Sequence, residues 1–376
     1  MVNVGIIGLG KMGLSHLSII NTDPRVRVVG LCDATSYLLA VMNKYTGLGT
    51  FGDYRSMIDQ AKPDAVIVAT PSRSHGEITR YALERGIHVF VEKPFCLSTN
   101  EGRELTAMPP AASVVNQVGY HYRFVSTFQE VKRLLEEGVI GTVHNYRIEA
   151  YGPVVLQPKG STWRSTKAEG GGCLFDYASH AVNLSNYLFG MPAGVGGSVL
   201  HGVFSRDVED EVYSTLYHTG GLSGQLCINW SDDTHRKMSM RVEAWGTNGK
   251  INADRQECQV YLRGGPSPDR LLSEGWNIRY TTELTKPVRY YVRGEEYSAQ
   301  IDYFMDRIES GTRENVNAFA SALETDLVLD MLQRDAALGP RTLAAVRHDG
   351  ESVRPRGLRA RLIRKLGGTP DLQGVS

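Results

Sequence analysis

Short apolar runs alternate with helical patterns over the first part of the chain. The run at 2–7 is β-branched and is followed by glycines and a helical pattern, and later runs end at Asp33 and near Lys93. Strands that alternate with helices form a parallel sheet with helices on both faces. This pattern predicts a doubly wound α/β domain over residues 1–120.

Local signals suggest where two elements of this domain begin and end. Ser98, with Glu101 three residues later, has the pattern of a capping box at the start of a helix. The proline-containing tract 108–112 predicts the end of that helix before a strand at 113–119.

The pattern changes beyond residue 120. Several β-type runs are joined by glycine-containing turns such as Gly220-Gly221 and Asn248-Gly249, which favour hairpins and a mostly antiparallel, open sheet. Helical spacing occurs before, between and after these runs. The expected elements are helices at 128–137, 173–189, 299–309 and 321–336, and strands at 143–151, 195–204, 211–217, 222–230, 238–245 and 259–263.

The length of 376 residues exceeds what one hydrophobic core usually organises. We expect a nucleotide-binding domain at 1–120, a substrate-binding and oligomerisation domain of α+β type at 121–340, and a basic tail at 341–376. Leucines at 358, 362 and 366 in the tail could contact an acidic partner or a membrane surface. A solvated tail is the favoured interpretation, because the segment is short and flanked by glycine.

Charge and cysteine content exclude several classes of protein. Lysine plus arginine equals aspartate plus glutamate, at 41 each, so no general attraction to nucleic acid is expected. The five cysteines are scattered and never form a Cys-x-x-Cys pair, which favours reduced thiols over disulfides or a metal site. No signal peptide or membrane-length apolar run is present, so we expect a cytoplasmic protein without membrane insertion.

A glycine motif, Gly-x-Gly-x-x-Gly, lies between the first strand and the first helix. Gly8 permits the tight turn, Gly10 lets the backbone approach a pyrophosphate, and Gly13 lets helix and strand pack closely. Asp33, at the end of the next strand, would bind the adenosine ribose and disfavour a 2′-phosphate, so NAD is preferred over NADP. The alternative is a glycine-rich turn that binds nothing. The cofactor-binding set at this turn is Gly8, Gly10, Lys11, Met12, Gly13 and Asp33.

Further candidates follow the later strands of the same sheet. Ligands of such sheets bind beyond the carboxyl ends of the strands, where two groups of polar residues lie in this chain. Lys93, fixed by the following proline, would lie beside the cofactor; the alternative is a surface ion pair with Glu92. The further cofactor-binding candidates are Thr70, Pro71, Ser72, His75, Glu92 and Lys93.

Asp176, His180 and Asn183 follow a triple glycine at 170–172 at spacings of four and three, so they share one face of a helix. Removal of a hydride from a secondary alcohol also releases a proton, which requires a base near the hydroxyl. His180 is the best candidate for this base.

These motifs together resemble the glucose-fructose oxidoreductase and inositol dehydrogenase (Gfo/Idh/MocA) family over roughly residues 2–336. The resemblance rests on the glycine motif, Glu92-Lys93-Pro94, Arg123-Phe124, Trp163-Arg164, and the triple glycine with Asp176 and His180. It implies a Rossmann domain, an α/β domain whose open sheet mediates dimers or tetramers, and hydride transfer between a nicotinamide cofactor and a sugar or cyclitol.

The resemblance assigns Lys93, Asp176 and His180 as the catalytic set. Asn183 departs from the family pattern, which usually has a second aspartate there, so substrate identity does not transfer. Alternatives are a sensor that binds NAD without catalysis and an NAD-dependent glycosidase. The substrate-binding candidates are Lys93, Tyr120, Arg123, Trp163, Arg164, Asp176, His180 and Asn183, and no metal site is expected.

Overall fold

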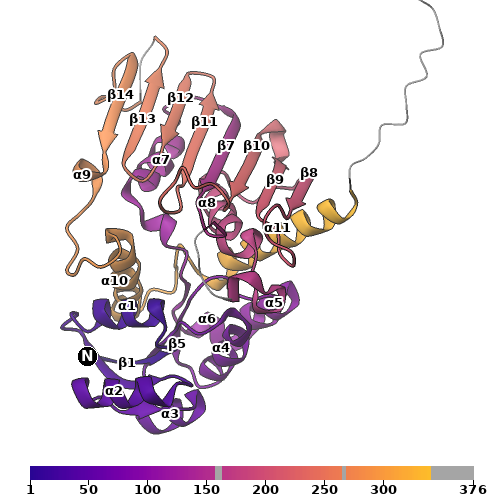
Figure 1. Ribbon diagram of the computed structural model, residues 1–376. Helices are drawn as coiled ribbons and strands as arrows, with labels where there is room; N and C mark the ends of the chain where they lie inside the picture. The colour runs from indigo at the N-terminus through magenta and orange to yellow at the C-terminus, as the bar shows by residue number, and fades with distance from the viewer. Residues whose placement is uncertain (157–162, 265–267, 340–376) are drawn as a thin grey trace, which may run out of the picture. The chain divides into compact units, whose positions relative to one another are not determined.

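Two β-sheets organise the protein in the computed structural model, which describes residues 1–156, 163–264 and 268–339 (Figure 1). The predicted basic tail lies outside these residues. So do its three leucines.

The first sheet has six strands in the order β3-β2-β1-β4-β5-β6, and all neighbouring strands are parallel. Its central strands β4 and β5 are almost entirely buried, as expected for a parallel sheet with helices on both faces. The predicted Rossmann-type sheet is therefore confirmed. The strands are β1 (Val2–Ile7), β2 (Val26–Cys32), β3 (Thr50–Phe51), β4 (Ala65–Val68), β5 (His88–Val91) and β6 (Asn116–Val118).

The helices of this half show where local signals failed. The preceding helix ends at Ala107, as the tract 108–112 predicts. Pro109–Ser113 then forms the short helix α6, because proline is well suited to the first helical position, and the strand begins only at Asn116. The predicted capping box is wrong: Ser98 is the N-cap of α5, but its side chain makes no capping hydrogen bond. The helices are α1 (Lys11–Ile20), α2 (Ser36–Thr46), α3 (Tyr54–Ala61), α4 (His75–Leu83) and α5 (Thr99–Ala107).

The second sheet has eight strands in the order β14-β13-β12-β11-β7-β10-β9-β8. All pairs are antiparallel except β10 with β7, which confirms the mostly antiparallel prediction. β12 and β14 were not predicted as separate strands. The strands are β7 (Val143–Tyr151), β8 (Gly194–His201), β9 (Glu211–Tyr217), β10 (Ser223–Asn229), β11 (Arg241–Gly246), β12 (Gly249–Ala253), β13 (Glu257–Leu262) and β14 (Gly275–Tyr280).

Helices cover one face of this sheet and leave the other open (Figure 1). Along β9 buried side chains alternate with less buried ones, and along β14 partly buried side chains alternate with exposed ones, as expected when only one face is covered. Trp276 and Tyr280 on β14 are 57% and 49% exposed. The covering helices are α7 (Ser126–Glu136), α8 (Ser179–Phe189) and α11 (Phe319–Ala337).

Helix α10 (Glu295–Ser310) comes late in the chain but packs on the first half. Phe304 and Met305 belong to the same apolar cluster as Ile6 and Phe90 of the first sheet. α10 also contacts α1 and the 3-10 turn at His121–Phe124. The short helix α9 (Thr281–Leu284) precedes it.

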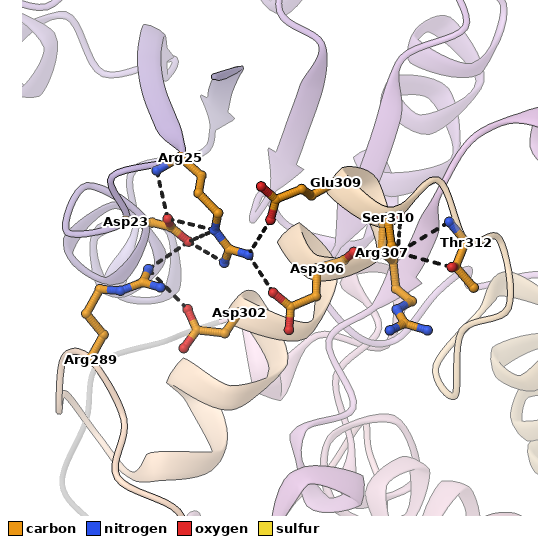
Figure 2. Close-up of polar contacts among 9 residues, drawn as sticks. All are labelled: Asp23, Arg25, Arg289, Asp302, Asp306, Arg307, Glu309, Ser310 and Thr312. Atoms are coloured by element: carbon orange, nitrogen blue, oxygen red, sulfur yellow. Dashed lines mark hydrogen bonds and ion pairs between the residues drawn. The ribbon is translucent and has the colours of Figure 1, made fainter.

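An ion-pair network fixes α10 to the loop before β2 (Figure 2). Asp23 is 3% exposed and accepts from Arg25 at 2.7 Å and from Arg289 at 2.7 Å. Arg25 also reaches Asp306 at 2.5 Å and Glu309 at 3.1 Å on α10. Burial raises the pKa of Asp23, but the hydrogen bonds from Arg25 and Arg289 lower that pKa to about 2.

Candidate active site

The glycine loop joins β1 to α1 with the geometry expected for each glycine. Gly8 has φ +92°, and a Cβ there would lie 2.7 Å from the Ala69 carbonyl carbon. A Cβ on Gly13 would lie 1.8 Å from the Gly8 carbonyl oxygen, so only glycine fits. Nothing lies within 4 Å of the Cβ position of Gly10, the N-cap of α1, which leaves backbone open to a phosphate group.

Asp33 lies directly after β2 and beside this loop. Its Oδ2 accepts from the Leu9 N–H at 2.7 Å and its Oδ1 accepts from the Thr35 N–H at 2.8 Å. These bonds fix the carboxylate between two loops at the carboxyl end of the sheet. Lys11 and Met12 form the first turn of α1. The arrangement fits a dinucleotide, while the role of each residue remains a prediction.

His75 ties together the loops that follow β4 and β5. Its Nδ1 lies 2.8 Å from the Pro94 carbonyl oxygen and its Nε2 lies 3.0 Å from the Thr70 carbonyl oxygen. Burial lowers the pKa of His75, so the ring is neutral and donates to one of the two oxygens at a time. Pro71 precedes the 3-10 turn at Ser72–Ser74, which leads into α4.

Lys93 does not pair with Glu92, which excludes the surface ion pair considered above. Its Nζ lies 2.7 Å from Asp176 Oδ1 and 2.9 Å from the Asp176 carbonyl oxygen. The Lys93 side chain is 13% exposed, and the Lys93–Pro94 peptide bond is cis. Glu92 bonds instead to His16 on α1, with Nε2 and Oε1 separated by 2.6 Å. The lysine at the end of β5 therefore reaches into the second half of the chain.

Asp176 lies between two cations. Its Oδ2 accepts from Arg164 Nε at 2.8 Å, opposite the bond to Lys93. Burial by itself raises the pKa of Asp176, but the charges and hydrogen bonds of Lys93 and Arg164 lower that pKa to about 2. Asp176 is therefore an anion that orients both cations, and it is not a proton acceptor near neutral pH.

The triple glycine makes this arrangement sterically feasible. A Cβ on Gly171 would lie 2.4 Å from the Arg164 carbonyl oxygen and 2.6 Å from that of Trp163. The Trp163–Ser165 turn can therefore approach the start of the turn that carries Asp176, and the Arg164 guanidinium lies over the Trp163 ring at 4.6 Å.

His180 is 4% exposed and lies among aromatic rings. Its ring centroid is 5.8 Å from that of Tyr120, 4.8 Å from His121 and 5.3 Å from Tyr122. Its Nδ1 has no hydrogen-bond partner among the described residues. Burial, and then the charge of Lys93, hold the pKa of His180 well below the usual range. The ring is therefore neutral, which is the form a base requires.

The predicted common helix face is only partly correct. Asp176 lies on a π-helical turn, Leu174–Ala178, before α8 begins at Ser179. Asp176 bonds to Lys93, and burial together with the charge of Lys93 lowers the pKa of His180. Asn183, by contrast, bonds to other groups. Its Oδ1 accepts from Arg123 Nε at 2.7 Å, and its Nδ2 donates to Thr325 Oγ1 at 3.0 Å.

Arg123 is 5% exposed and is held by the protein itself. It donates to Asn183 through Nε and, at 3.2 Å, to the Asn183 carbonyl oxygen, and it also donates to the Val316 carbonyl oxygen. Burial lowers its pKa to about 10, so Arg123 remains charged. The predicted substrate roles of Arg123 and Asn183 are untested, and both residues already have protein partners.

The sequence patterns did not identify His121, Tyr297 and Arg255 as residues of this region. His121 stacks on Tyr297 of α10, with ring centroids 4.4 Å apart, and Arg255 pairs with Glu296 in the same region. The adjacent aromatic residues at 120–122 were a signal for His121. Nothing in the sequence links Tyr297 or Arg255 to this site, because they come from distant parts of the chain.

Three other properties concern the chain more widely. Among the described residues no group of three or more His, Cys, Asp or Glu side chains could hold a metal ion. Within the same ranges, no helix has both the length and the apolar character needed to cross a membrane. All five cysteines are free thiols.

The first half of the chain has a Rossmann-type sheet with this glycine loop. The second half places a buried histidine and aspartate near the lysine that follows β5. Together these features define a dinucleotide-binding oxidoreductase. Residues 2–120 match the model "Oxidoreductase family, NAD-binding Rossmann fold", and residues 128–252 match the "GFO/IDH/MocA C-terminal domain". The chain belongs to the Gfo/Idh/MocA family of NAD(P)-dependent oxidoreductases.

The chain is also similar to named dehydrogenases. A levoglucosan dehydrogenase from Pseudarthrobacter phenanthrenivorans is 28% identical over 319 residues, which cover 74% of this chain and 80% of the relative. A scyllo-inositol 2-dehydrogenase (NADP(+)) from Bacillus subtilis is 26% identical over 218 residues, 57% of this chain and 59% of the relative.

A solved levoglucosan dehydrogenase in complex with NADH and levoglucosan superposes with a TM-score of 0.78 at 25% identity. The match covers 90% of this chain and 97% of that structure. Its bound NADH supports the assignment of an NAD(P)-binding Rossmann half in this chain.

Proposed function

We propose that this chain transfers a hydride between a nicotinamide dinucleotide and a secondary alcohol or ketone of a sugar, cyclitol or nucleotide sugar. The observation that carries the proposal is the convergence of Lys93, Asp176 and His180 at the end of β5. The ammonium, its carboxylate partner and a neutral imidazole come from the two halves of the chain. The names of the relatives support a polyhydroxylated substrate.

Each of these three side chains has a distinct role in the proposal. His180 takes the hydroxyl proton during oxidation, since its ring is neutral and buried. Lys93 donates a hydrogen bond to the reacting oxygen, and Asp176 holds the ammonium in place. A bound nicotinamide ring would accept or supply the hydride. Metal ligands are not needed for any of these roles.

The substrate-binding part of the proposal rests on the groups around this triad. Trp163, Arg164 and Tyr120 offer aromatic surface and a cation, which suit a hydroxyl-rich ring. Arg123 and Asn183 act in this proposal by bonding to each other and supporting α8.

We infer a preference for NAD over NADP from Asp33, whose fixed carboxylate would repel a 2′-phosphate. One relative is named for NADP(+) and a solved relative holds NADH, so both cofactors occur among the similar proteins. Titration of the purified chain with NAD+ and NADP+ measures the preference directly. Tighter binding of NADP+ would overturn this assignment.

The open face of the second sheet supports a homodimer or homotetramer. Alternate side chains of β14 expose Trp276, Ile278 and Tyr280, and Tyr217 is 51% exposed on β9. Large exposed aromatic groups on one face are typical of interfaces. Light scattering should show an oligomer in the native chain, and Trp276→Glu should shift it toward the monomer.

The experiment that tests the activity is a substrate panel. Sugars, inositols and nucleotide sugars would be supplied with NAD+, and formation of NADH would be followed by absorbance. We expect turnover with at least one class, a kcat lower by about 10²–10⁴ in Lys93→Ala, and full activity in Lys44→Ala, which removes an exposed lysine on α2.

Two outcomes would favour the alternatives. Tight cofactor binding without turnover of any alcohol would support a sensor. Cofactor that copurifies with the chain, together with cleavage of a glycoside and no net NADH, would support a glycosidase.

A further inference from the structure

The turn that carries Asp176 is held at its start by a residue from a distant loop. Leu174–Ala178 is a π-helical turn, and its N-cap, Cys173, makes no capping hydrogen bond through its side chain. The Leu174 N–H donates to Glu209 Oε1 at 2.8 Å, and the Cys173 N–H donates to the Glu209 carbonyl oxygen at 2.9 Å. Glu209 therefore supplies acceptors for N–H groups that have no partner within the helix.

Gly172 leaves the space that this carboxyl group occupies. A Cβ on Gly172 would lie 2.2 Å from Glu209 Oε1, and Gly172 has φ +104°. Any other residue would therefore be strained and would displace the carboxyl group from the Leu174 N–H. The third glycine of the triple glycine is required by its contact with Glu209.

Glu209 is itself fixed to the second sheet. The next residue, Asp210, is 0% exposed and accepts from Trp230 Nε1 and from N–H groups of the loop that precedes it. Strand β9 begins directly after this pair, at Glu211. The second sheet therefore sets the position of Glu209, and Glu209 sets the position of the turn.

Asp176 lies on this turn, two positions after Leu174. Its carboxylate accepts from Lys93 Nζ at 2.7 Å and from Arg164 Nε at 2.8 Å, so movement of the turn changes the position of the lysine's partner. Resting on the function proposed above, we propose that Glu209 is a positioning residue for the reaction. It holds the turn in the place where Asp176 keeps the Lys93 ammonium beside the reacting oxygen.

Glu209 acts in this role as a hydrogen-bond acceptor. Burial raises its pKa and the hydrogen bond from the Leu174 N–H lowers that pKa, but the carboxyl group can accept this bond whether or not it is ionised. Glu209→Gln should keep the bond through its amide oxygen. Glu209→Ala removes the bond and leaves the N–H of the fully buried Leu174 without this partner.

A double-mutant cycle with Lys93 tests the role in the full chain. Glu209→Ala should lower kcat by about 10–100-fold, because a shift of ~1 Å in a reacting group has effects of this size. In the Lys93→Ala background the same change should cost less than about threefold, since no ammonium remains to be positioned. KM and the affinity for NAD+ should change little, and Glu209→Gln should restore most of kcat.

Chemical labelling measures the same relationship without turnover. Acylation by acetic anhydride, followed by mass spectrometry, reports how readily each lysine reacts. Lys93 should react about tenfold faster in Glu209→Ala than in the native chain, because its ammonium is bonded to Asp176 for less of the time. Lys44, which is exposed on α2, should react at the same rate in both chains.

Asp210→Asn is the matched control. The Asp210 side chain bonds to the preceding loop and to Trp230 rather than to the turn, so its replacement should lower the unfolding temperature. The folded variant should keep the native kcat and the native rate of Lys93 labelling.

The outcomes separate this inference from the proposed function. Equal losses of kcat in the two backgrounds, or native labelling of Lys93 in a folded Glu209→Ala chain, would overturn the inference. A native chain that oxidises no alcohol, while the labelling changes as expected, would overturn the proposed function and leave the positioning of Lys93 in place. If Glu209→Ala fails to fold, Glu209→Asp takes its place in both experiments, because its shorter side chain draws the carboxyl group away from the Leu174 N–H.

Discussion

Lys93 Nζ lies 2.7 Å from Asp176 Oδ1, although 83 positions separate the two residues in the chain. Lys93 follows the fifth strand of the first sheet, and Asp176 lies on the π-helical turn that leads into α8. The charge and hydrogen bond of Lys93 help to hold Asp176 in its charged form, although Asp176 is buried. The pair therefore links the fold of both halves to the chemistry proposed for the site.

Lys93→Ala tests the donor of this pair. We expect kcat to fall by about 10²–10⁴, because the reacting oxygen loses its positioned hydrogen-bond donor. Asp176 keeps Arg164 as a partner, so the chain should fold normally. Steady-state kinetics and NAD+ titration measure the two effects. Substantial turnover in the variant would refute the assignment.

The pH profile of oxidation tests His180. Burial and the charge of Lys93 hold its pKa well below the usual range, so the neutral base persists as the solution becomes acidic. The acidic limb of kcat/KM should therefore fall at lower pH than an ordinary histidine, about 6.5, would produce. His180→Gln should remove this limb together with most of the activity. An unchanged profile in that variant would exclude His180 as the base.

Asn183→Ala distinguishes a supporting role from substrate contact. The change leaves Arg123 Nε and Thr325 Oγ1 without their partner, so the free energy of unfolding should fall by about 1–3 kcal/mol. KM for the substrate should change little. Denaturant unfolding and kinetics report the two effects, and a large rise in KM with unchanged stability would contradict the structural role.

The network around Asp23 should contribute to acid stability. The pKa of Asp23 is about 2 in the folded chain and 3.8 ordinarily, so its contribution is present above about pH 4 and is lost as the pH falls toward 2. Asp23→Asn should lower the free energy of unfolding at neutral pH by about 1.5–3 kcal/mol. The same substitution should also make the free energy of unfolding less dependent on pH in the acid range. Urea unfolding across this pH range provides the measurement, with exposed Asp207→Asn as a control.

Asp326 on α11 should change stability with pH in the direction opposite to that of Asp23. It is 5% exposed, and burial raises its pKa well above the ordinary value. The folded state then binds the proton more tightly, so the stability contribution is present at low pH and is lost as pH rises through the folded pKa. Asp326→Asn should gain relative stability with increasing pH, by up to about 1.4 kcal/mol per pH unit. A pH-independent difference would contradict this.

The glycine loop could be predicted because its constraints are local in sequence. Gly13 must be glycine owing to the Gly8 carbonyl oxygen, five residues earlier, and Gly8 itself has a positive φ. The alternation of strands and helices likewise gave the parallel sheet, since burial on both faces produces continuous apolar runs. Lys93 followed from its place at the end of such a run.

The partners of the candidate residues could not be predicted in the same way. Asn183 was assigned to the substrate because it shares a helical spacing with Asp176 and His180. A substrate role for Asn183 is untested, but its side-chain partners within the chain, Arg123 and Thr325, are 60 and 142 residues away. Side-chain partners at such separations depend on tertiary packing, which residue spacing does not encode. Ser98 failed as a capping box for the same reason: a local pattern cannot show which group its side chain will meet.

Helix α11 contacts α5 in the first half and both α8 and β8 in the second. One continuous helix of 19 residues thus packs against the element after Lys93 and the element that carries His180. A hinge motion that separated the two halves would break the packing contacts of α11 with one of them. If the chain has the proposed function, the lysine and the imidazole are already in place before the substrate binds, and substrate specificity depends on which molecules fit this site.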